Sequence, residues 1–281
     1  MTRPATAAAL VADAAARLAA AGVASPRVDA ELLVAHVLGI GRGRLLLAGP
    51  PDAAGQERVE ALVGRRAARE PLQHLLGSAV LGPAEVAVGP GVFVPRPETE
   101  LLFTWALGAV DGSPTPTVVD LCTGSGALAL ALAAARPDAA VHAVEAAPDA
   151  LAWARRNVTG SSVLLHAADV TAPGVLAGLD GTVDLVVANP PYVPSGADVG
   201  PEVRHDPAVA VFAGPDGLDL ITPVARLAAR LLRPAGQVGI EHDETHADAV
   251  RDRVGAAGFT RVVVHPDLTG RDRFTTGERA R

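Results

Sequence analysis

The stretch TVVDLCTGSGALAL, residues 117–130, joins a β-type run to a glycine-containing turn and then to a helical pattern. Apart from Asp120, the run Thr117–Leu121 is β-branched and aliphatic, as in a buried strand. Gly124 and Gly126 allow the backbone to turn sharply and to approach a ligand closely, and the first amides of the following helix are free to bind it. The next β-type run ends in Glu145, and in doubly wound folds an acidic residue at that place accepts hydrogen bonds from a ribose. The stretch predicts a nucleoside-binding site, although the glycines alone do not say which nucleoside.

The second part of the chain alternates β-type runs with helical patterns, which favours an α/β fold with a largely parallel sheet covered on both faces. The predicted strands are Thr117–Leu121, Ala140–Glu145, Val163–Ala167, Val183–Ala188, Gln237–Glu241 and Arg261–His265, with a final strand in the Arg-rich tail. The first 75 residues show helical spacing only, and the next stretch holds short β-type runs between Gly and Pro. We therefore expect a helical domain over residues 1–75, a β-hairpin linker over 76–96 and the α/β domain over 97–281.

The composition narrows the class of protein. The chain has 281 residues, of which 49% are hydrophobic and 20% charged, so two folded domains can form. A net charge of −7 argues against a protein that grips a nucleic-acid backbone. The single cysteine, Cys122, excludes an internal disulfide and a thiolate metal cluster, and it fits a reducing cytoplasm.

Two further features of the composition limit the chemistry and the location. The chain contains no lysine, which excludes a Walker A lysine and a Schiff-base lysine. The Ala-rich N-terminal stretch is interrupted by Asp13 and Arg17, so it predicts an amphipathic helix and not a secretory segment. We expect a soluble, cytoplasmic, monomeric protein that does not associate with a membrane.

The stretch VDLVVANPPYVPSG, residues 183–196, ends a predicted core strand with an amide, two prolines and a phenol. Proline has no amide proton and a fixed φ, so the turn is stiff and its carbonyl oxygens are free to accept hydrogen bonds. Asn189 adds a side-chain carbonyl. Ligands of open α/β sheets bind at the carboxyl ends of the strands, so we expect this turn beside the Gly-rich one. Two rigid acceptors could hold an NH₂ group by both hydrogens, with Tyr192 packed over the planar group.

An NPPY turn after a buried strand resembles the motif of class I S-adenosylmethionine-dependent methyltransferases that act on planar nitrogens, including amides and exocyclic base amines. Further stretches narrow the likeness: PLQHLLG (71–77), FVPRPETE (93–100), HDPAVAVFAGPDGLD (205–219) and DLTGRDRF (267–274). Together they closely resemble the family of peptide chain release factor glutamine N5-methyltransferases, over essentially the whole chain. The resemblance implies a Rossmann-like class I methyltransferase domain with a mostly parallel seven-stranded sheet, preceded by a small all-α domain and a β-hairpin linker.

The resemblance also implies roles for individual residues. The Gly-rich turn would bind the methionine part of S-adenosylmethionine, Glu145 would bind its ribose, and Asp169 and Val170 would border its adenine. The implied cofactor-binding residues are Cys122, Thr123, Gly124, Ser125, Gly126, Glu145, Asp169, Val170 and Asn189. The acceptor glutamine, in the Gly-Gly-Gln motif of class I peptide chain release factors, would lie against Asn189, Pro190, Pro191, Tyr192, Arg96 and Glu98. Asn189, Pro190 and Tyr192 would be the catalytic residues. Cys122 and Val170 depart from the residues that are common in the family at those positions.

The chemistry that follows is in-line transfer of a methyl group from a sulfonium sulfur to an amide nitrogen. A primary amide is a poor nucleophile because its lone pair is delocalised into the carbonyl, so positioning is the main lever. Carbonyl acceptors would also stabilise the positive charge that grows on nitrogen. The methylated amide loses its proton readily, so we assign no general base.

Other functions remain open from the motifs alone. A DNA or RNA adenine or cytosine N-methyltransferase could share NPPY, but it would need a basic groove and a target-reading module. An NAD-dependent oxidoreductase fits the glycines but gives no reason for NPPY, and a non-enzymatic nucleotide-binding regulator gives no reason for NPPY or Glu145. His242 and His246 are four residues apart, but the glutamate is misplaced for a zinc motif, so we expect no metal site.

Overall fold

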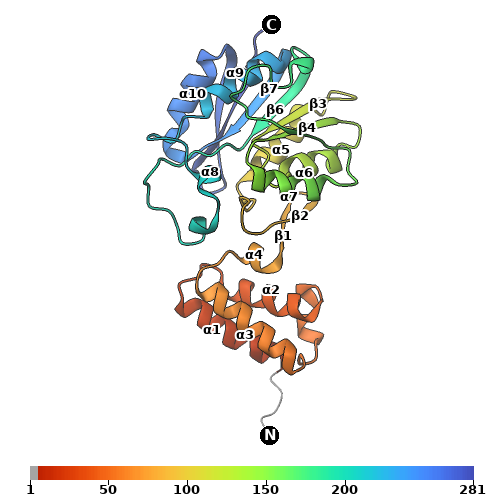
Figure 1. Cartoon of the computed structure of the whole chain (residues 1–281), viewed down its shortest axis with the longest axis vertical. Helices are drawn as coiled ribbons and strands as arrows, with labels where there is room; N and C mark the ends of the chain where they lie inside the picture. The colour runs from red at the N-terminus through yellow and green to blue at the C-terminus, as the bar shows by residue number, and fades with distance from the viewer. Residues whose placement is uncertain (1–5) are drawn as a thin grey trace. The chain divides into compact units, whose positions relative to one another are not determined.

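The computed structural model describes residues 6–281, which divide into two compact units (Figure 1). One unit runs to Ser78 and also includes Val199–His205. The other comprises Ala79–Asp198 and Asp206–Arg281. The sequence had assigned residues 199–205 to the α/β domain, whereas in the structure this segment clusters with the helices.

The first unit is all-helical. Its elements are α1 (Ala7–Ala20), α2 (Pro26–Leu38), the 3₁₀ turn η1 (Arg42–Leu47), α3 (Ala53–Ala67), α4 (Leu72–Leu76) and, from the later segment, η3 (Val203–His205). Thr6 and Asp52 cap α1 and α3, because their side chains accept hydrogen bonds from amides in the first helical turn. Leu18, Leu33 and Val63 are fully buried between the helices, so the unit has a hydrophobic core of its own.

Glu202 joins the segment 199–205 to the helices of the same unit. Its carboxylate accepts hydrogen bonds from Arg69 Nε at 2.7 Å, from Arg69 Nη2 at 2.9 Å and from Arg66 Nη2 at 3.0 Å. Arg66 is buried and also donates to Asp29 at 2.8 Å. Partial burial raises the pKa of Glu202, but hydrogen bonds from Arg69 and Arg66 outweigh it and lower that pKa to about 2.

This arrangement predicts an acid-sensitive attachment of the segment. A carboxylate whose folded pKa is depressed adds stability above its unfolded pKa, and that stability is lost as the pH falls toward the folded value. We expect Glu202→Gln to speed hydrogen–deuterium exchange of the amides of residues 199–205 at pH 7. Wild-type exchange, corrected for intrinsic rates, should approach that of the variant between pH 4.5 and 2. The exposed control Glu57→Gln should exchange as wild type does, and equal protection in Glu202→Gln would contradict the prediction.

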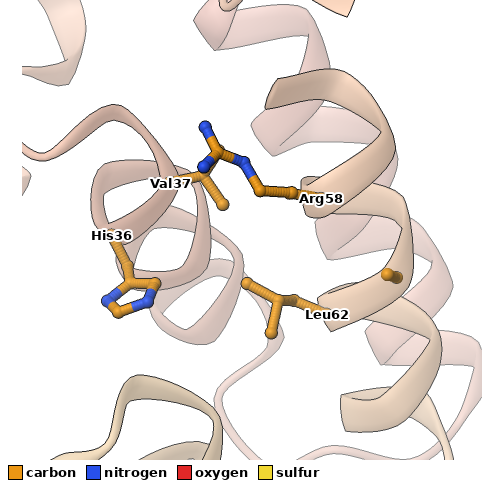
Figure 2. A pocket seen from close by; sticks show the side chains of 5 residues that line it. His36, Val37, Arg58 and Leu62 are labelled. Atoms are coloured by element: carbon orange, nitrogen blue, oxygen red, sulfur yellow. The ribbon is translucent and has the colours of Figure 1, made fainter. Parts of the chain in front are cut away.

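A pocket of about 310 Å³ opens in the helical unit between α2 and α3 (Figure 2). It is lined by His36, Val37, Arg58, Ala61 and Leu62. The same unit exposes two leucines of η1, Leu46 and Leu47, each to 90%. The pocket and these leucines give the unit apolar surface that its own fold leaves uncovered.

The second unit is built on a seven-stranded sheet in the order β5-β4-β3-β6-β7-β9-β8. Its strands are β3 (Thr117–Leu121), β4 (Ala140–Glu145), β5 (Leu164–Ala167), β6 (Val183–Ala188), β7 (Leu232–Glu241), β8 (Phe259–Pro266) and β9 (Asp272–Arg279). Only β9 runs antiparallel to its neighbours. This confirms the predicted Rossmann-like α/β fold with a mostly parallel seven-stranded sheet. The strand bounds agree with those predicted to within two residues, except that β7 begins at Leu232 and not at Gln237.

Helices cover both faces of this sheet (Figure 1). They are α5 (Thr99–Ala109), α6 (Ala127–Ala135), α7 (Pro148–Val158), α9 (Ile221–Leu231) and α10 (Ala247–Ala256). The unit also contains the short α8 (Ala208–Val211) and the 3₁₀ turns η2 (Ala177–Leu179) and η4 (Glu244–His246). Alternate residues of one strand enter opposite cores: Val118 packs with α5 and α6, whereas Val119 packs with α9 and α10. Both faces of the central strands are therefore apolar, as parallel strands between helices require.

The hairpin of β1 (Ser78–Leu81) and β2 (Ala84–Ala87) contributes to the same core. Leu81 and Val86 are each 1% exposed and pack with α5 and α6. Glu100 of α5 accepts a hydrogen bond from the Gly82 amide at 2.7 Å. From Ala79 onward, the segment expected as a linker is thus part of the packed α/β unit. Within residues 6–281, no helix is long and apolar enough to cross a bilayer.

Candidate functional site

The two motif turns leave neighbouring strands at the same edge of the sheet. β3 and β6 pair in parallel, with Leu121 opposite Ala188. Cys122 directly follows Leu121, and Asn189 directly follows Ala188, so the Gly-rich turn and the NPPY turn begin side by side. The chain proceeds from β3 outward to β4 and β5, and from β6 outward the other way to β7, which makes this the topological switch point of the sheet. The predicted juxtaposition is confirmed.

A buried carboxyl group, that of Asp120, accepts a hydrogen bond from the Gly-rich turn. Thr123 Oγ1 donates to Asp120 Oδ2 at 2.5 Å, and Asp120 is 1% exposed at the end of β3. Burial raises the pKa of Asp120 to about 7, against the opposing effect of the Thr123 hydrogen bond. Gly124 and Gly126 have φ of +59° and +84°, a region that glycine enters without strain. A Cβ on Gly124 would meet nothing within 4 Å, so that side of the turn is open.

Glu145 at the end of β4 connects this turn to the next helix. Its Oε2 accepts from the Gly124 amide at 2.8 Å. Its Oε1 accepts from the amides of Ala146 and Ala147, at 2.9 and 2.8 Å. The carboxylate is therefore fixed beside the open Gly-rich turn, where an acidic residue that binds the ribose is expected.

Cys122 has a φ of +60°, which is uncommon for a residue other than glycine. A φ of this sign favours glycine, so the Cys122 backbone holds a conformation that few side chains adopt. Burial raises the pKa of the Cys122 thiol, and the nearby carboxylates of Glu145 and Asp120 raise it further. The side chain is a partly exposed thiol whose raised pKa keeps it uncharged.

Asp169 and Val170 follow β5, the strand next to β4. Asp169 is exposed, and its Oδ1 accepts from the amide and the hydroxyl of Thr171 at 2.8 and 2.7 Å. These hydrogen bonds lower the pKa of Asp169. Val170 packs against the core that contains Leu121. The pair lies at the strand end where the adenine border is expected.

In the NPPY turn, Asn189 Nδ2 donates to Thr99 Oγ1 at 3.2 Å. Pro190 is buried, and Asn189, Pro191 and Tyr192 are partly exposed. The Tyr192 hydroxyl lies 3.5 Å from Oε1 of Glu241. Because the amide NH₂ of Asn189 faces Thr99, its carbonyl oxygen is the end left for a ligand.

The chain after NPPY is held by backbone hydrogen bonds to the segment that carries the AGPDGLD stretch. Val193 donates to the carbonyl of Val211 at 2.9 Å and accepts from the Ala213 amide at 2.9 Å. Gly217 in this stretch has a φ of +74°, and a Cβ there would lie 2.3 Å from the carbonyl oxygen of Tyr192. The stretch noted for its family resemblance therefore supports the NPPY turn directly.

Gly217→Ala should displace Tyr192, because the new methyl group cannot occupy the space of a backbone oxygen. We expect a loss of about 1–3 kcal/mol in the free energy of unfolding, measured by urea denaturation. Gly196→Ala is a matched control, since Gly196 has a φ of +87° with nothing within 4 Å of its Cβ position. Equal stability of the two variants would show that the collision with Tyr192 is not the cause.

Arg96 and Glu98 lie on the loop before α5. Arg96 forms an ion pair with the buried carboxylate of Asp206, which also accepts from the Val94 amide at 3.1 Å. The Arg96 guanidinium stacks 5.0 Å from the ring centroid of Phe93. Burial raises the pKa of Glu241 and of Tyr192, and the nearby Glu98 charge raises both further. The loop is thus near NPPY, as expected.

Sequence reasoning missed four side chains that hold the two turns. They are Thr99, Asp120, Asn157 and Glu241. Asn157 of α7 donates to the carbonyls of Ala87 and Ser125, each at 2.9 Å, and so ties the hairpin to the Gly-rich turn. Thr99 lies in the FVPRPETE stretch and Asp120 in the TVVDLCTGSGALAL stretch. A polar residue at the end of a core strand could have marked Asp120 and Glu241 as candidates.

The two histidines of the HDETH stretch have structural positions. His242 is 1% exposed, and its ring nitrogens contact Thr275 Oγ1 at 2.8 Å and the Asp243 carbonyl at 2.9 Å. His246 closes η4 and precedes α10, so the stretch joins the end of β7 to the start of a helix. Over residues 6–281, no group of three or more His, Cys, Asp or Glu side chains could hold a metal ion.

Comparison with known proteins agrees with this architecture. Two family models match: the PrmC N-terminal domain over residues 9–77 and the Methyltransferase small domain over residues 99–206. A release factor glutamine methyltransferase of Mycolicibacterium smegmatis is 56% identical over 266 residues, 94% of each chain. Proteins of the same name from Corynebacterium glutamicum and Deinococcus radiodurans are 50% and 44% identical, covering 95% and 96% of this chain and 96% and 98% of their own.

A solved methyltransferase structure from Pyrococcus furiosus shares the fold of the α/β unit. It superposes with a TM-score of 0.50 over 70% of this chain and 89% of its own, at 19% identity. That likeness supports the fold alone. The relatives, by contrast, share close to half or more of their residues with this chain over almost its whole length. The protein therefore belongs to the family of release factor glutamine methyltransferases.

Proposed function

We propose that this protein transfers a methyl group from S-adenosylmethionine to the side-chain amide nitrogen, N5, of the glutamine in the Gly-Gly-Gln motif of class I peptide chain release factors. The observation that carries the proposal is the position of Asn189. Its NH₂ group is bound by Thr99, 3.2 Å away, at the strand end beside the Gly-rich turn. An amide carbonyl is thereby left to accept from a second amide at the edge of a nucleoside site.

The residues of the Gly-rich edge fit S-adenosylmethionine. The turn Thr123–Gly126 has an open side at Gly124, and the fixed carboxylate of Glu145 lies beside it. In this proposal Glu145 binds the ribose hydroxyls, Cys122 to Gly126 enclose the methionine part, and Asp169 with Val170 borders the adenine. When bound, S-adenosylmethionine would supply an electrophilic methyl group on a sulfonium sulfur.

The NPPY turn would hold the acceptor. Asn189 Oδ1 and the Pro190 carbonyl would accept from the two amide hydrogens, with Pro191 and Tyr192 beside the planar group. Such orientation can supply on the order of 7–11 kcal/mol toward the barrier of a reaction with a poor nucleophile. The same two carbonyl dipoles would stabilise positive charge that develops on the amide nitrogen. Arg96 and Glu98 would contact the peptide around the glutamine.

The helical unit would recognise the release factor. Its support is twofold. Leu46 and Leu47 are exposed to solvent, and a pocket opens between α2 and α3 (Figure 2). We further propose that the protein acts as a monomer in the cytoplasm and without a stable nucleic-acid partner.

Mass spectrometry of a purified, unmethylated release factor after incubation with this protein and S-adenosylmethionine tests the function. We expect a gain of one methyl group, mapped to the glutamine of Gly-Gly-Gln. S-adenosylmethionine binding without any gain would reject this substrate, and DNA and RNA would then be assayed as acceptors.

A further inference from the structure

Glu241 is a buried carboxyl group at the end of β7, beside the NPPY turn. It is the last residue of β7, and Ile240 before it pairs with Ala188, the residue before Asn189. Glu241 is 2% exposed. A carboxyl group is rarely buried so fully, because removing it from water is costly unless other groups pair with it or form hydrogen bonds to it.

The neighbours of Glu241 are the side chains that shape the NPPY turn. The Tyr192 hydroxyl lies 3.5 Å from its Oε1, and its Oε2 is buried without a hydrogen-bond partner. Burial raises the pKa of Glu241 to about 7, while hydrogen bonds from Thr99, Asn189 and Tyr192 act to lower it. Glu241 therefore contacts Tyr192, and Thr99 and Asn189 lie close enough to influence its charge.

The direction of these hydrogen bonds decides which end of the Asn189 amide faces the acceptor. A hydroxyl carries one proton, so a Thr99 hydroxyl that donates to a carboxylate must accept from Asn189. Asn189 Nδ2 is 3.2 Å from Thr99 Oγ1, which satisfies that requirement. A protonated or amidated Glu241 could instead donate to Thr99, and the amide of Asn189 could then rotate by half a turn.

Resting on the proposed function, we infer that Glu241 is a positioning residue whose carboxylate, through Thr99, keeps the Asn189 NH₂ turned inward and its carbonyl oxygen turned toward the acceptor amide. With Asn189 reversed, two NH₂ groups would face each other. Glu241 would thus act on the orientation of the acceptor and not on the binding of S-adenosylmethionine.

A dependence on pH follows. Because the carboxylate is the form that only accepts, the methylation rate should rise as the pH increases through about 7. The other titratable and charged groups around Glu241 are Glu98 before α5, Tyr192 after β6, Arg273 on β9, and His242 and Asp243 after β7. The rise in rate through pH 7 is assigned to Glu241 only if a Glu241 variant no longer shows it.

The test measures kcat, KM for a release factor and the pH profile of the intact protein, with S-adenosylmethionine affinity from calorimetry. Glu241→Gln should lower kcat by roughly tenfold to a hundredfold, remove the rise through pH 7 and leave that affinity within about twofold. The control Glu244→Gln lies three residues away on the surface and should match wild type. A wild-type kcat and pH profile in Glu241→Gln would overturn the inference.

Thr99 provides a second test that does not depend on the folding of Glu241→Gln. Thr99→Val removes the hydroxyl and should lose rate as Glu241→Gln does, whereas Thr99→Ser keeps it and should restore most of the rate. Equal rates in Thr99→Val and Thr99→Ser would overturn the inference while the methylation itself still stood. Absence of glutamine methylation by the wild-type protein would overturn the proposed function, and this inference with it.

Discussion

Asn189→Ala is expected to reduce the methylation rate by roughly a hundredfold to a thousandfold. The substitution removes the side-chain carbonyl that would accept from the glutamine amide and that would stabilise positive charge on its nitrogen. It also ends the hydrogen bond to Thr99. Single-turnover methylation of a release factor, followed by mass spectrometry, measures the effect.

Asn189 lies on the strand end shared by both motif turns, so the controls must separate the acceptor from the cofactor. We expect the affinity of Asn189→Ala for S-adenosylmethionine to change by less than about fivefold, since the Gly-rich turn and Glu145 are intact. Ser195→Ala, an exposed side chain later in the same loop, should match wild type in both measurements. Similar losses of rate and of cofactor affinity in Asn189→Ala would contradict the acceptor role.

Glu145→Ala is expected to weaken S-adenosylmethionine binding on the order of a hundredfold. The carboxylate accepts from the backbone amides of Gly124, Ala146 and Ala147. The substitution therefore removes the proposed ribose acceptor and releases the turn that would enclose the methionine part. Hydrogen bonds to a charged group contribute about 1.5–3 kcal/mol, and about 1.4 kcal/mol corresponds to a tenfold change in affinity.

Isothermal titration calorimetry with S-adenosylmethionine and with S-adenosylhomocysteine measures this loss without any acceptor present. Asp149→Asn is a suitable control, because Asp149 is exposed in the first turn of α7, only one turn of chain beyond Glu145. Its affinity should remain near that of wild type. Undiminished binding by Glu145→Ala would mean that the nucleoside is held elsewhere.

The sequence by itself determined the elements and the two motif turns, because these depend on residues that are adjacent in the chain. The β-branched runs at Thr117–Leu121 and Val183–Ala188 are strands with the predicted bounds. The alternation of strands and helices was sufficient for a parallel sheet, and the general rule that ligands bind at strand ends placed NPPY beside the Gly-rich turn.

Only the tertiary structure decided which distant side chains hold those turns. Glu241 contacts the NPPY turn because β7 pairs with β6, and Thr99 contacts Asn189 because α5 packs over the same strands. Glu202 likewise binds Arg69 across 133 residues of sequence. Such contacts are set by strand order and helix packing, which bring together residues with no local pattern in common, so no periodicity or spacing in the sequence could reveal them.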